Sequence, residues 1–173
     1  MIQENCPEII LRALEPEDLD LFYTIENDPQ IWEVSNTCTP ISRYAIKQYL
    51  ALQPQEVFQA GELRLVIEDL RHQAVGLLDL TSISILDGRA EVGIAILKEQ
   101  RGKGYGLAAL RKLTRYAKVK LRLRFLFAQM GVDSGKKSIS IFESNGYRRV
   151  ALLPKWHHGD NGIEDVVIYQ KIL

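Results

Sequence analysis

A basic, glycine-rich stretch holds the residues whose types and spacing best suit a chemical task. It reads Gln100-Arg101-Gly102-Lys103-Gly104-Tyr105-Gly106. Glycines at alternate positions have no Cβ to keep a ligand from the backbone, and they permit positive φ. If a helix begins within the stretch, its free N–H groups and its dipole favour an anion, and Arg101 and Lys103 add positive charge beside it. The stretch therefore predicts a phosphate-binding turn.

Two familiar phosphate motifs do not fit this stretch. A dinucleotide fingerprint would need its third glycine at Leu107, and a nucleotide P-loop would need Ser or Thr where Gly104 stands. The pattern that remains is Arg101-x-x-Gly104-x-Gly106. A tight strand-to-helix turn, rich in glycine for its geometry alone, is the alternative that binds nothing.

The elements that must position this turn flank it directly. Residues 92–97 carry no polar side chain, so we expect a strand that is buried on both faces in the middle of a sheet. From Leu107 onward, helical spacing places Leu107, Leu110, Leu113 and Ala117 on one face, toward a core. The three parts together predict a strand, a phosphate-binding turn and a helix, in that order.

Composition narrows the class of protein. With 173 residues and a formal net charge of zero, the chain suits a single domain, and nucleic-acid binding has no electrostatic support. No window approaches the length and apolarity of a membrane span, and the first residues do not resemble a secretion signal. Cys6 and Cys38 lack metal-type spacing, so we expect free thiols, and the chain is predicted to be a cytoplasmic protein.

Periodicity and turn residues predict one α+β domain over residues 1–173, with a single mostly antiparallel sheet flanked by helices. We expect helices from Pro16, from Ser42 and from Ser134 as N-cap, and an irregular segment over residues 30–39. The remaining strands are expected over residues 8–14, 62–69, 74–84, 123–130, 147–153 and 166–172. The polar residues 154–164 are expected to separate the last two strands.

The pattern Arg101-x-x-Gly104-x-Gly106 resembles the acyl-CoA-binding signature of the GNAT superfamily of N-acetyltransferases, and the order of elements resembles the GNAT fold. Residues 11–18, Asn27-Asp28-Pro29, residues 75–80 and Asn145-Gly146-Tyr147 are similar to the subgroup of spermidine/spermine and ribosomal-protein N-terminal acetyltransferases. The resemblance implies acetyl-CoA as co-substrate, a small-molecule amine as partner and no metal. It leaves a homo-oligomer possible.

Two carboxylates are candidates for the base that takes a proton from the amine. Glu91 matches the position of a frequent catalytic glutamate, and desolvation at the edge of an apolar strand would raise its pKa. Its plainer interpretation is a solvent-exposed pair with Arg89. Asp79, on the neighbouring strand, could share the base role or hold a cationic substrate, or could be an outward polar residue.

Other site residues follow from the family geometry. The main chain of Ile94, Ala95 and Ile96 would face the thioester and pantetheine, because the family's strand splays from its neighbour there. Arg101, Gly102, Lys103, Gly104, Tyr105 and Gly106 would cradle the pyrophosphate. Trp32 and Glu33 lie in the segment that borders the acceptor site in similar enzymes.

The chain departs from the family pattern at two positions. Phe142 stands where many members have a tyrosine that protonates the leaving thiolate, and Gly135 replaces an asparagine that contacts pantetheine. Ser138 or Ser140 could supply a hydroxyl instead, whereas Tyr147 is expected in the core. The pair His157-His158 is expected to be an exposed loop pair and not a metal site, because adjacent strand residues point to opposite faces.

Three functions remain open at this point. The first is acetylation of a small polyamine or amino compound, and the second is acetylation of a protein N-terminus. The third is a non-catalytic acyl-CoA-binding module, which Phe142 and Gly135 keep in view.

Overall fold

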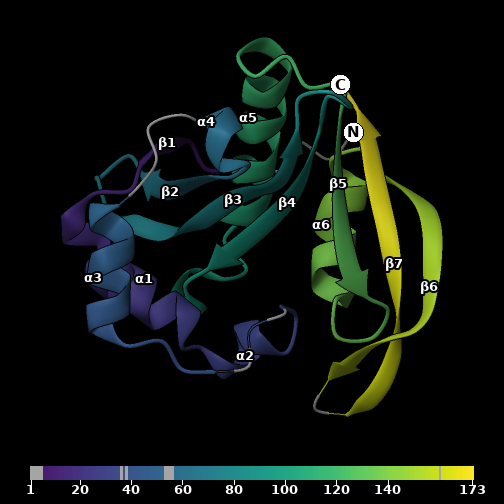
Figure 1. Cartoon of the computed structure of the whole chain (residues 1–173), viewed down its shortest axis with the longest axis horizontal. Coiled ribbons are helices and arrows are strands. Elements are labelled where there is room, and N and C mark those ends of the chain that lie inside the picture. Colours follow the sequence, from purple (N-terminus) through teal and green to yellow (C-terminus); the bar gives the residue numbers. More distant parts are fainter. Residues whose placement is uncertain (1–5, 36, 38, 53–56, 160) are drawn as a thin grey trace.

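The computed structural model of the chain describes residues 6–35, 37, 39–52, 57–159 and 161–173. Seven strands form one sheet in the order β1-β2-β3-β4-β5-β7-β6 (Figure 1). The strands are β1 Ile9–Ala13, β2 Leu63–Asp69, β3 Ala74–Ser84, β4 Arg89–Ile96, β5 Phe125–Gly131, β6 Arg148–Gly159 and β7 Gly162–Ile172. All neighbours pair antiparallel except β4 and β5. The predicted α+β class is confirmed.

Helices cover both faces of the sheet. The α-helices are α1 Leu19–Glu26, α2 Pro29–Trp32, α3 Arg43–Ala51, α4 Val57–Ala60, α5 Tyr105–Val119 and α6 Lys136–Ser144, and the 3-10 helices are η1 Pro16–Asp18 and η2 Lys98–Gln100. The larger core packs α5 and α6 on one face, and the smaller core packs α1 and α3 on the other. Leu77 and Leu78 of β3 belong to different cores, as side chains that alternate along a strand require.

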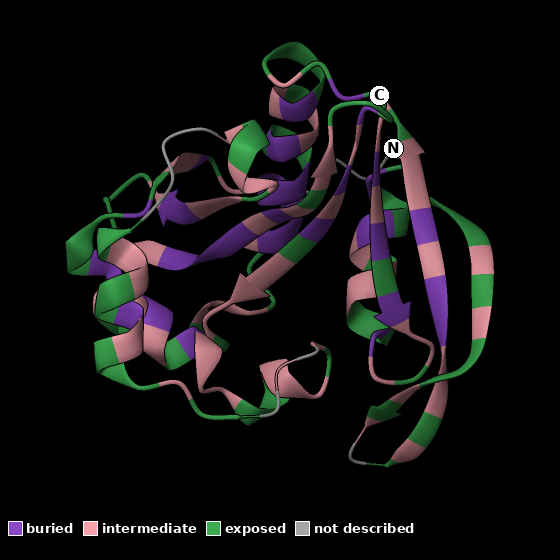
Figure 2. Cartoon of the chain, viewed as in Figure 1, coloured by how far each residue is buried: buried purple, intermediate pink, exposed green. Residues whose placement is uncertain are grey.

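The helix α5 forms as its sequence predicts. Leu107, Leu110, Leu113 and Ala117 are all buried, the last three completely (Figure 2). Gly104, with φ of 84°, is its N-cap, so the helix does begin within the glycine-rich turn.

The strand that is buried on both faces is β3, and the prediction that residues 92–97 would be buried on both faces is wrong. Along β3, Val75, Leu77, Leu78 and Leu80 are at most 2% exposed. In β4 the predicted apolar run is open, with Gly93 exposed and residues 94–96 only half-buried. The reason that this run is open lies in the pairing of β4 with β5.

Strands β4 and β5 separate soon after they meet. Their parallel pairing joins only Arg89, Ala90 and Glu91 to residues 125–127. Beyond Glu91 the two strands diverge, and the sheet opens into a fork with β1–β4 in one arm and β5, β7 and β6 in the other (Figure 1). Residues 93–96 therefore border an opening on the β5 side, which explains why they are not buried.

Three local expectations differ from the structure. The segment over residues 30–39 includes the end of α2, because Asp28 accepts a hydrogen bond from Gln30 N and caps that short helix. The N-cap of α6 is Gly135, since the Ser134 hydroxyl donates instead to Glu164 Oε1 at 2.5 Å. Strands β6 and β7 continue through most of the polar segment, with His157 paired to Glu164.

The predicted left-handed cap of α6 is confirmed. Gly146 has a φ of 81°, its N–H donates to Glu143 O, and Tyr147 N–H donates to Phe142 O. These two bonds form a Schellman motif, which turns the chain from α6 into β6.

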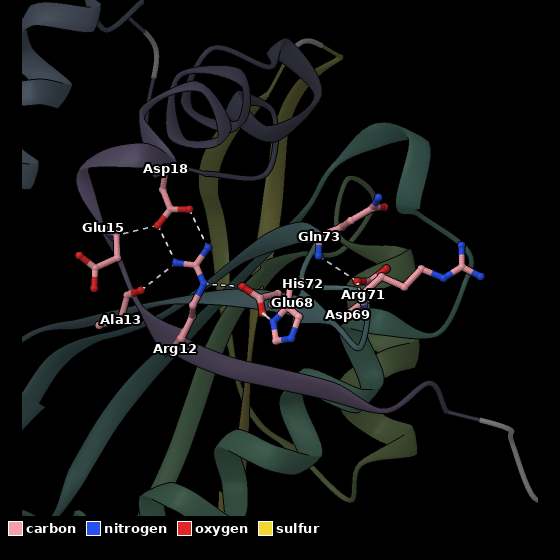
Figure 3. A network of polar contacts seen from close by, with 9 residues as sticks. All are labelled: Arg12, Ala13, Glu15, Asp18, Glu68, Asp69, Arg71, His72 and Gln73. Carbon is pink, nitrogen blue, oxygen red and sulfur yellow. Dashed lines mark hydrogen bonds and ion pairs between the residues drawn. The ribbon is translucent and has the colours of Figure 1, made fainter.

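Arg12 ties together the edge of the sheet and the first helical turn (Figure 3). Its guanidinium donates two hydrogen bonds to Asp18, at 2.7 and 2.8 Å, and one to Glu68 at 2.5 Å. Both carboxylates are buried, and Glu68 also contacts His72 Nδ1 at 2.7 Å. Arg12 lowers the pKa of Glu68 and supplies the hydrogen bonds and charge that lower the pKa of Asp18 against the effect of burial. At this edge of the sheet, the buried carboxylates of Asp18 and Glu68 are thus both paired with the Arg12 guanidinium, and we call it the closed edge.

Candidate active site

The turn between β4 and α5 has the open backbone that its glycines predict. Gly102, with φ of 78°, has nothing within 4 Å of the place where a Cβ would stand. A Cβ at Gly106 would lie 3.6 Å from Ile141 and 3.9 Å from Ile96, so Gly106 faces the space between α6 and β4. Ala108 N donates to Gly104 O. The N–H groups of residues 105–107 precede that bond and have no partner within the helix, which is the arrangement that receives anions.

Gly104 serves packing as well as conformation. Its φ of 84° is left-handed, and Pro7 Cδ lies 3.0 Å from the place of its missing Cβ. A side chain at this position would be strained and would also press on the N-terminal segment. The two uses of glycine in this turn, open approach at Gly102 and tight packing at Gly104, thus fall on different positions.

The two cations of the turn lie differently. The Lys103 ammonium is at the surface and donates to Gln100 Oε1 at 2.9 Å. The Arg101 guanidinium is turned toward α2, where it contacts Asp28 at 2.6 Å and Gln30 at 2.5 Å. Its Nε donates to Ile96 O at 2.9 Å. Lys103 therefore remains beside the turn, whereas Arg101 links the turn to the segment after α1.

Beyond the fork, β4 has a ladder partner on one side only. Ile94, Ala95 and Ile96 pair with β3 in register with Leu78, Leu77 and Gly76. Past Glu91, no described residue of β5 pairs with this run. Main-chain groups that point toward β5 are thus available to a ligand, as the family resemblance implies for these residues.

Glu91 stands at the point where β4 and β5 part. It pairs with Phe127 across the last parallel step, and its Oε1 accepts a hydrogen bond from Gln129 Nε2 at 3.1 Å. Burial raises the pKa of Glu91, and the Gln129 hydrogen bond opposes that rise. No ion pair joins Glu91 to Arg89 among the described residues, because Arg89 contacts Asp87 at 3.1 Å. The carboxyl is thus half-buried and without a cation.

Asp79 lies on the same face as Glu91, opposite Gly93. Arg64 donates to both of its oxygens, at 2.7 and 2.9 Å, and to Glu26 at 3.0 Å. Burial raises the pKa of Asp79, and the Arg64 guanidinium opposes that rise. Asp79 is thus engaged by two guanidinium hydrogen bonds, whereas Glu91 has no such partner among the described residues.

The segment after α2 lies at the open end of the fork (Figure 1). Trp32 is fixed by a hydrogen bond from its Nε1 to Glu26 O at 2.6 Å, and the carbonyl of Glu33 contacts His157 Nε2 at 2.9 Å. A cavity of about 310 Å³ lies between this segment, the turn after β5 and the β6–β7 hairpin. It is lined by Glu33, Asp133, Ser134, Gly159, Asn161, Gly162, Ile163 and Glu164. Three carboxylates in one cavity suit a cation.

The departures from the family pattern have structural explanations. Phe142 is buried and meets Tyr147 edge to face, with ring centroids 4.8 Å apart, so both belong to the core. A Cβ at Gly135 would lie 2.5 Å from Gly131 O, which leaves no room for an asparagine. Ser138 is one helical turn before Ile141 and shares its face toward Gly106.

The histidine pair lies in β6 and not in a loop. Residues 157 and 158 point to opposite faces, and His157 is held by Glu33 O. Over the part of the chain that the structure describes, no group of three His, Cys, Asp or Glu could hold a metal. Cys6 is a free thiol there, and Cys38 lies outside the described residues.

Sequence reasoning missed three residues of this region. Glu91 is contacted by Gln129, which is 38 residues away in the chain. Arg101 is contacted by Asp28, 73 residues away, and Asp79 by Arg64, 15 residues away. Each is an ordinary polar residue in its own segment, and no local pattern announces its partner. None of the helices in the described ranges is long and apolar enough to cross a membrane.

Comparison with known proteins matches this geometry. The family model "Acetyltransferase (GNAT) domain" matches residues 8–148. The spermidine N(1)-acetyltransferase of Vibrio cholerae is 25% identical over 140 residues, which is 81% of this chain and 79% of that protein. An uncharacterized N-acetyltransferase, p20, of Bacillus licheniformis is 23% identical over 164 residues, which is 93% of this chain and 90% of that protein.

Solved structures agree on the fold. A crystal structure of spermidine N-acetyltransferase from Vibrio cholerae, in complex with CoA and spermine, superposes with a TM-score of 0.86 at 22% identity and covers 95% of both chains. The family model covers most of the chain, and the family and fold predicted from the sequence are confirmed. The chain belongs to the GNAT family of acetyltransferases.

Proposed function

We propose that this protein transfers an acetyl group from acetyl-CoA to a primary amine of a polyamine. The observation that carries the proposal is the fork in the sheet. The open turn, the unpaired side of β4 and the half-buried Glu91 all border the place where β4 and β5 part. The similarity to a spermidine acetyltransferase supports the choice of polyamine.

The residues of the turn would hold the diphosphate of the acyl carrier. The glycines at 102 and 106 leave the backbone accessible, the N–H groups of residues 105–107 point out of the helix, and Lys103 adds a charge at the surface. The space that Gly106 faces, between β4 and α6, would take the pantetheine. These features fit acetyl-CoA as the co-substrate.

Glu91 would remove the proton from the attacking amine. An alkyl amine with a pKa near ~10 is mostly protonated at neutral pH, and an ammonium has no lone pair with which to attack. A carboxylate whose pKa is raised by burial is a better base than an ordinary glutamate. Glu91 meets that condition and is not neutralised by a cation, whereas Asp79 is held by Arg64.

The remaining groups follow from the same opening. N–H groups of residues 94–96 would stabilise the oxyanion that develops when nitrogen attacks the thioester carbonyl. The thiolate of CoA is a good leaving group, comparable in acidity to cysteine at ~8.5, so a strong acid is not required. The Ser138 hydroxyl, on the helix face that contains Ile141, is the side chain we assign to donate a hydrogen bond to that thiolate.

A polyamine has further ammonium groups, and the cavity at the open end of the fork suits them. Glu33, Asp133 and Glu164 line it, and the ion pair between Lys136 and Asp133, at 2.8 Å, offsets one of the three charges. Ser134 and the two main-chain N–H groups of residues 133 and 134 lower the pKa of Glu164 against burial, so that Glu164 remains ionised. Trp32, held by its hydrogen bond to Glu26 O, stabilises the adjoining segment.

We further propose that the protein works in the cytoplasm, which supplies acetyl-CoA and keeps thiols such as that of Cys6 reduced.

Release of the CoA thiol with a panel of amines tests the function. We expect turnover with spermidine and spermine, and much less with an amine that has a single charge. Turnover only with an N-terminal peptide would replace the polyamine with a protein substrate. Binding of acetyl-CoA without turnover on any amine would leave a binding module.

A further inference from the structure

Arg101 is the one side chain of the glycine-rich turn that reaches the acceptor side of the molecule. Its Nε donates to Ile96 O at 2.9 Å, at the end of β4. Its two terminal nitrogens donate to Gln30 Oε1 at 2.5 Å and to Asp28 Oδ2 at 2.6 Å. One guanidinium thus joins the end of β4 to the start of α2.

Asp28 accepts the hydrogen bond from Arg101 with Oδ2, which is not the oxygen that caps α2. Its other oxygen, Oδ1, accepts from Gln30 N at 2.9 Å and caps α2. The Asp28 side chain is 18% exposed, so the ion pair is partly shielded from solvent. The short helix that Asp28 begins ends at Trp32, and Glu33 follows directly.

We propose that Asp28 is a positioning residue that couples the cofactor turn to the acceptor segment, through Arg101. The consequence is that binding of CoA shifts the start of α2, and with it the segment that contains Trp32 and Glu33, before the amine arrives. The proposal rests on the function proposed above, because it takes the turn as the CoA site and Glu33 as part of the acceptor site.

The donor count of Arg101 allows this coupling. A guanidinium has five N–H donors in a rigid fork, and the three contacts among the described residues use three of them. Two donors remain, so Arg101 can meet a phosphate oxygen without releasing Asp28. A dianionic ligand on one side and a carboxylate on the other then hold the guanidinium, and through it α2, in one place.

The region around the ion pair is only partly filled. A cavity of about 230 Å³ lies between α1, α2 and the end of β4, and Asp28, Ile31 and Ile96 are among its lining residues. Ile31 and Leu97 both pack against the smaller core, but beside the ion pair the two segments are separated by this space. Beside this cavity, the side chain of Arg101 joins the two segments by hydrogen bonds to Asp28, Gln30 and Ile96.

Fluorescence of Trp32 tests the proposal without requiring turnover. The chain has two tryptophans, so W156F leaves Trp32 as the only one, and Trp156 is 66% exposed in β6. In this parent, saturating CoA should change the emission of Trp32. In D28N the change at saturation should be lost, although calorimetry still shows CoA binding.

Two further variants separate coupling from capping. In D28N, the amide oxygen at position 28 can still accept the hydrogen bond from Gln30 N and cap α2. Q30E places a carboxylate oxygen where Gln30 Oε1 contacts Arg101. D28N/Q30E should therefore recover the Trp32 response, which a purely structural cap would not explain. D20N is the matched control, because Asp20 pairs with Arg43 on the exposed side of α1; it should respond as the parent does.

The outcomes are distinct. A Trp32 response that persists in D28N, that is missing in the parent while CoA binds, or that Q30E fails to recover overturns the coupling and leaves the proposed function standing. A parent that binds no CoA overturns both.

Discussion

Two arginines, Arg12 and Arg101, each join distant parts of the chain through carboxylates, but in very different surroundings. Their own side chains are similarly exposed, at 31% and 34%. The partners of Arg12, Asp18 and Glu68, have side chains that are only 7% exposed and lie at the closed edge of the sheet. Among the described residues Arg101 has one charged partner, Asp28, which lies at the open fork beside a cavity.

The difference shows how one residue type can serve stability or communication. Removing one partner from a buried ionic network leaves an uncompensated charge, so the Arg12 network resists any movement of β1 against β2. Arg101 keeps unused donors and a less crowded neighbourhood, so its contacts can change when a ligand arrives. We therefore expect variants near Arg12 to alter stability, and variants at the fork to alter binding and rate.

The largest expected effect removes the ligand from the fork. G106E places bulk and negative charge in the space between Ile96 and Ile141, where the acyl carrier is proposed to lie. We expect CoA affinity to fall at least about 100-fold, because an anion would be forced against an unpaired buried carboxylate. Calorimetry measures this, with thermal unfolding to show that the variant folds.

G106A is the matched control, since its Cβ would make only ordinary contacts at 3.6 and 3.9 Å. Position 106 is preferred to position 104, where positive φ and Pro7 would disturb folding as well. Unchanged CoA affinity in G106E would remove the turn from the cofactor site.

The next effect concerns rate at the same fork. E91Q should lower kcat at neutral pH by about 100-fold, the lower range for general bases. The loss should shrink at high pH, where the amine is already deprotonated. Because burial raises the pKa of Glu91, the parent's kcat should fall with decreasing pH through a value above that of an ordinary glutamate.

The hydrogen bond from Gln129 to Glu91 offers a second way to shift the acidic limb of the profile of kcat against pH. Gln129 lowers the pKa of Glu91, so Q129L should move the acidic limb of the rate profile to higher pH and leave CoA affinity unchanged. A limb at the same pH in E91Q as in the parent would exclude Glu91 as the base.

At the closed edge, R12M should affect stability alone. Loss of the guanidinium leaves Asp18 and Glu68 buried without their cation, and we expect the Tm to fall by roughly 5 to 10 °C. The matched control is R43M, whose pair with Asp20 is exposed on both sides and should matter little. A change in CoA affinity in R12M, or an unchanged Tm, would break the contrast between the two regions.

The smallest effect is the pH dependence of that stability. The pKa values of Asp18 and Glu68 are lowered in the folded protein, so their stabilisation is complete above the ordinary carboxyl range near ~4. It is lost as the pH falls through the lowered values. The Tm difference between the parent and R12M should therefore shrink as the pH falls below about 4, and a difference that stays constant there would contradict the assignment.

Much of this fold could be predicted because its signals are local. The spacing of Leu107, Leu110 and Leu113 specifies a helix face, and Asn145-Gly146 specifies a left-handed cap; both are confirmed. The glycine-rich turn identified the family for the same reason, since its residues are adjacent in the chain.

What could not be predicted depends on partners far away in sequence. The apolar run of β4 was expected to be buried, because periodicity does not reveal that β5 leaves it after Glu91. Arg101 was placed beside the phosphate, and its contacts 71 and 73 residues earlier were unforeseen. The roles of Glu91, Asp79, Trp32 and Glu33 stay predictions until the variants are measured.

The fork also governs how such a protein can diversify. Only three residue pairs join β4 to β5, so the two parts of the sheet are connected at one end and separate at the other. Substitutions in the β6–β7 hairpin can change the part of the sheet formed by β5, β7 and β6 without disturbing the glycine-rich turn that follows β4. Specificity for a new acceptor could thus be selected in one part of the sheet while the proposed cofactor site in the other part is preserved.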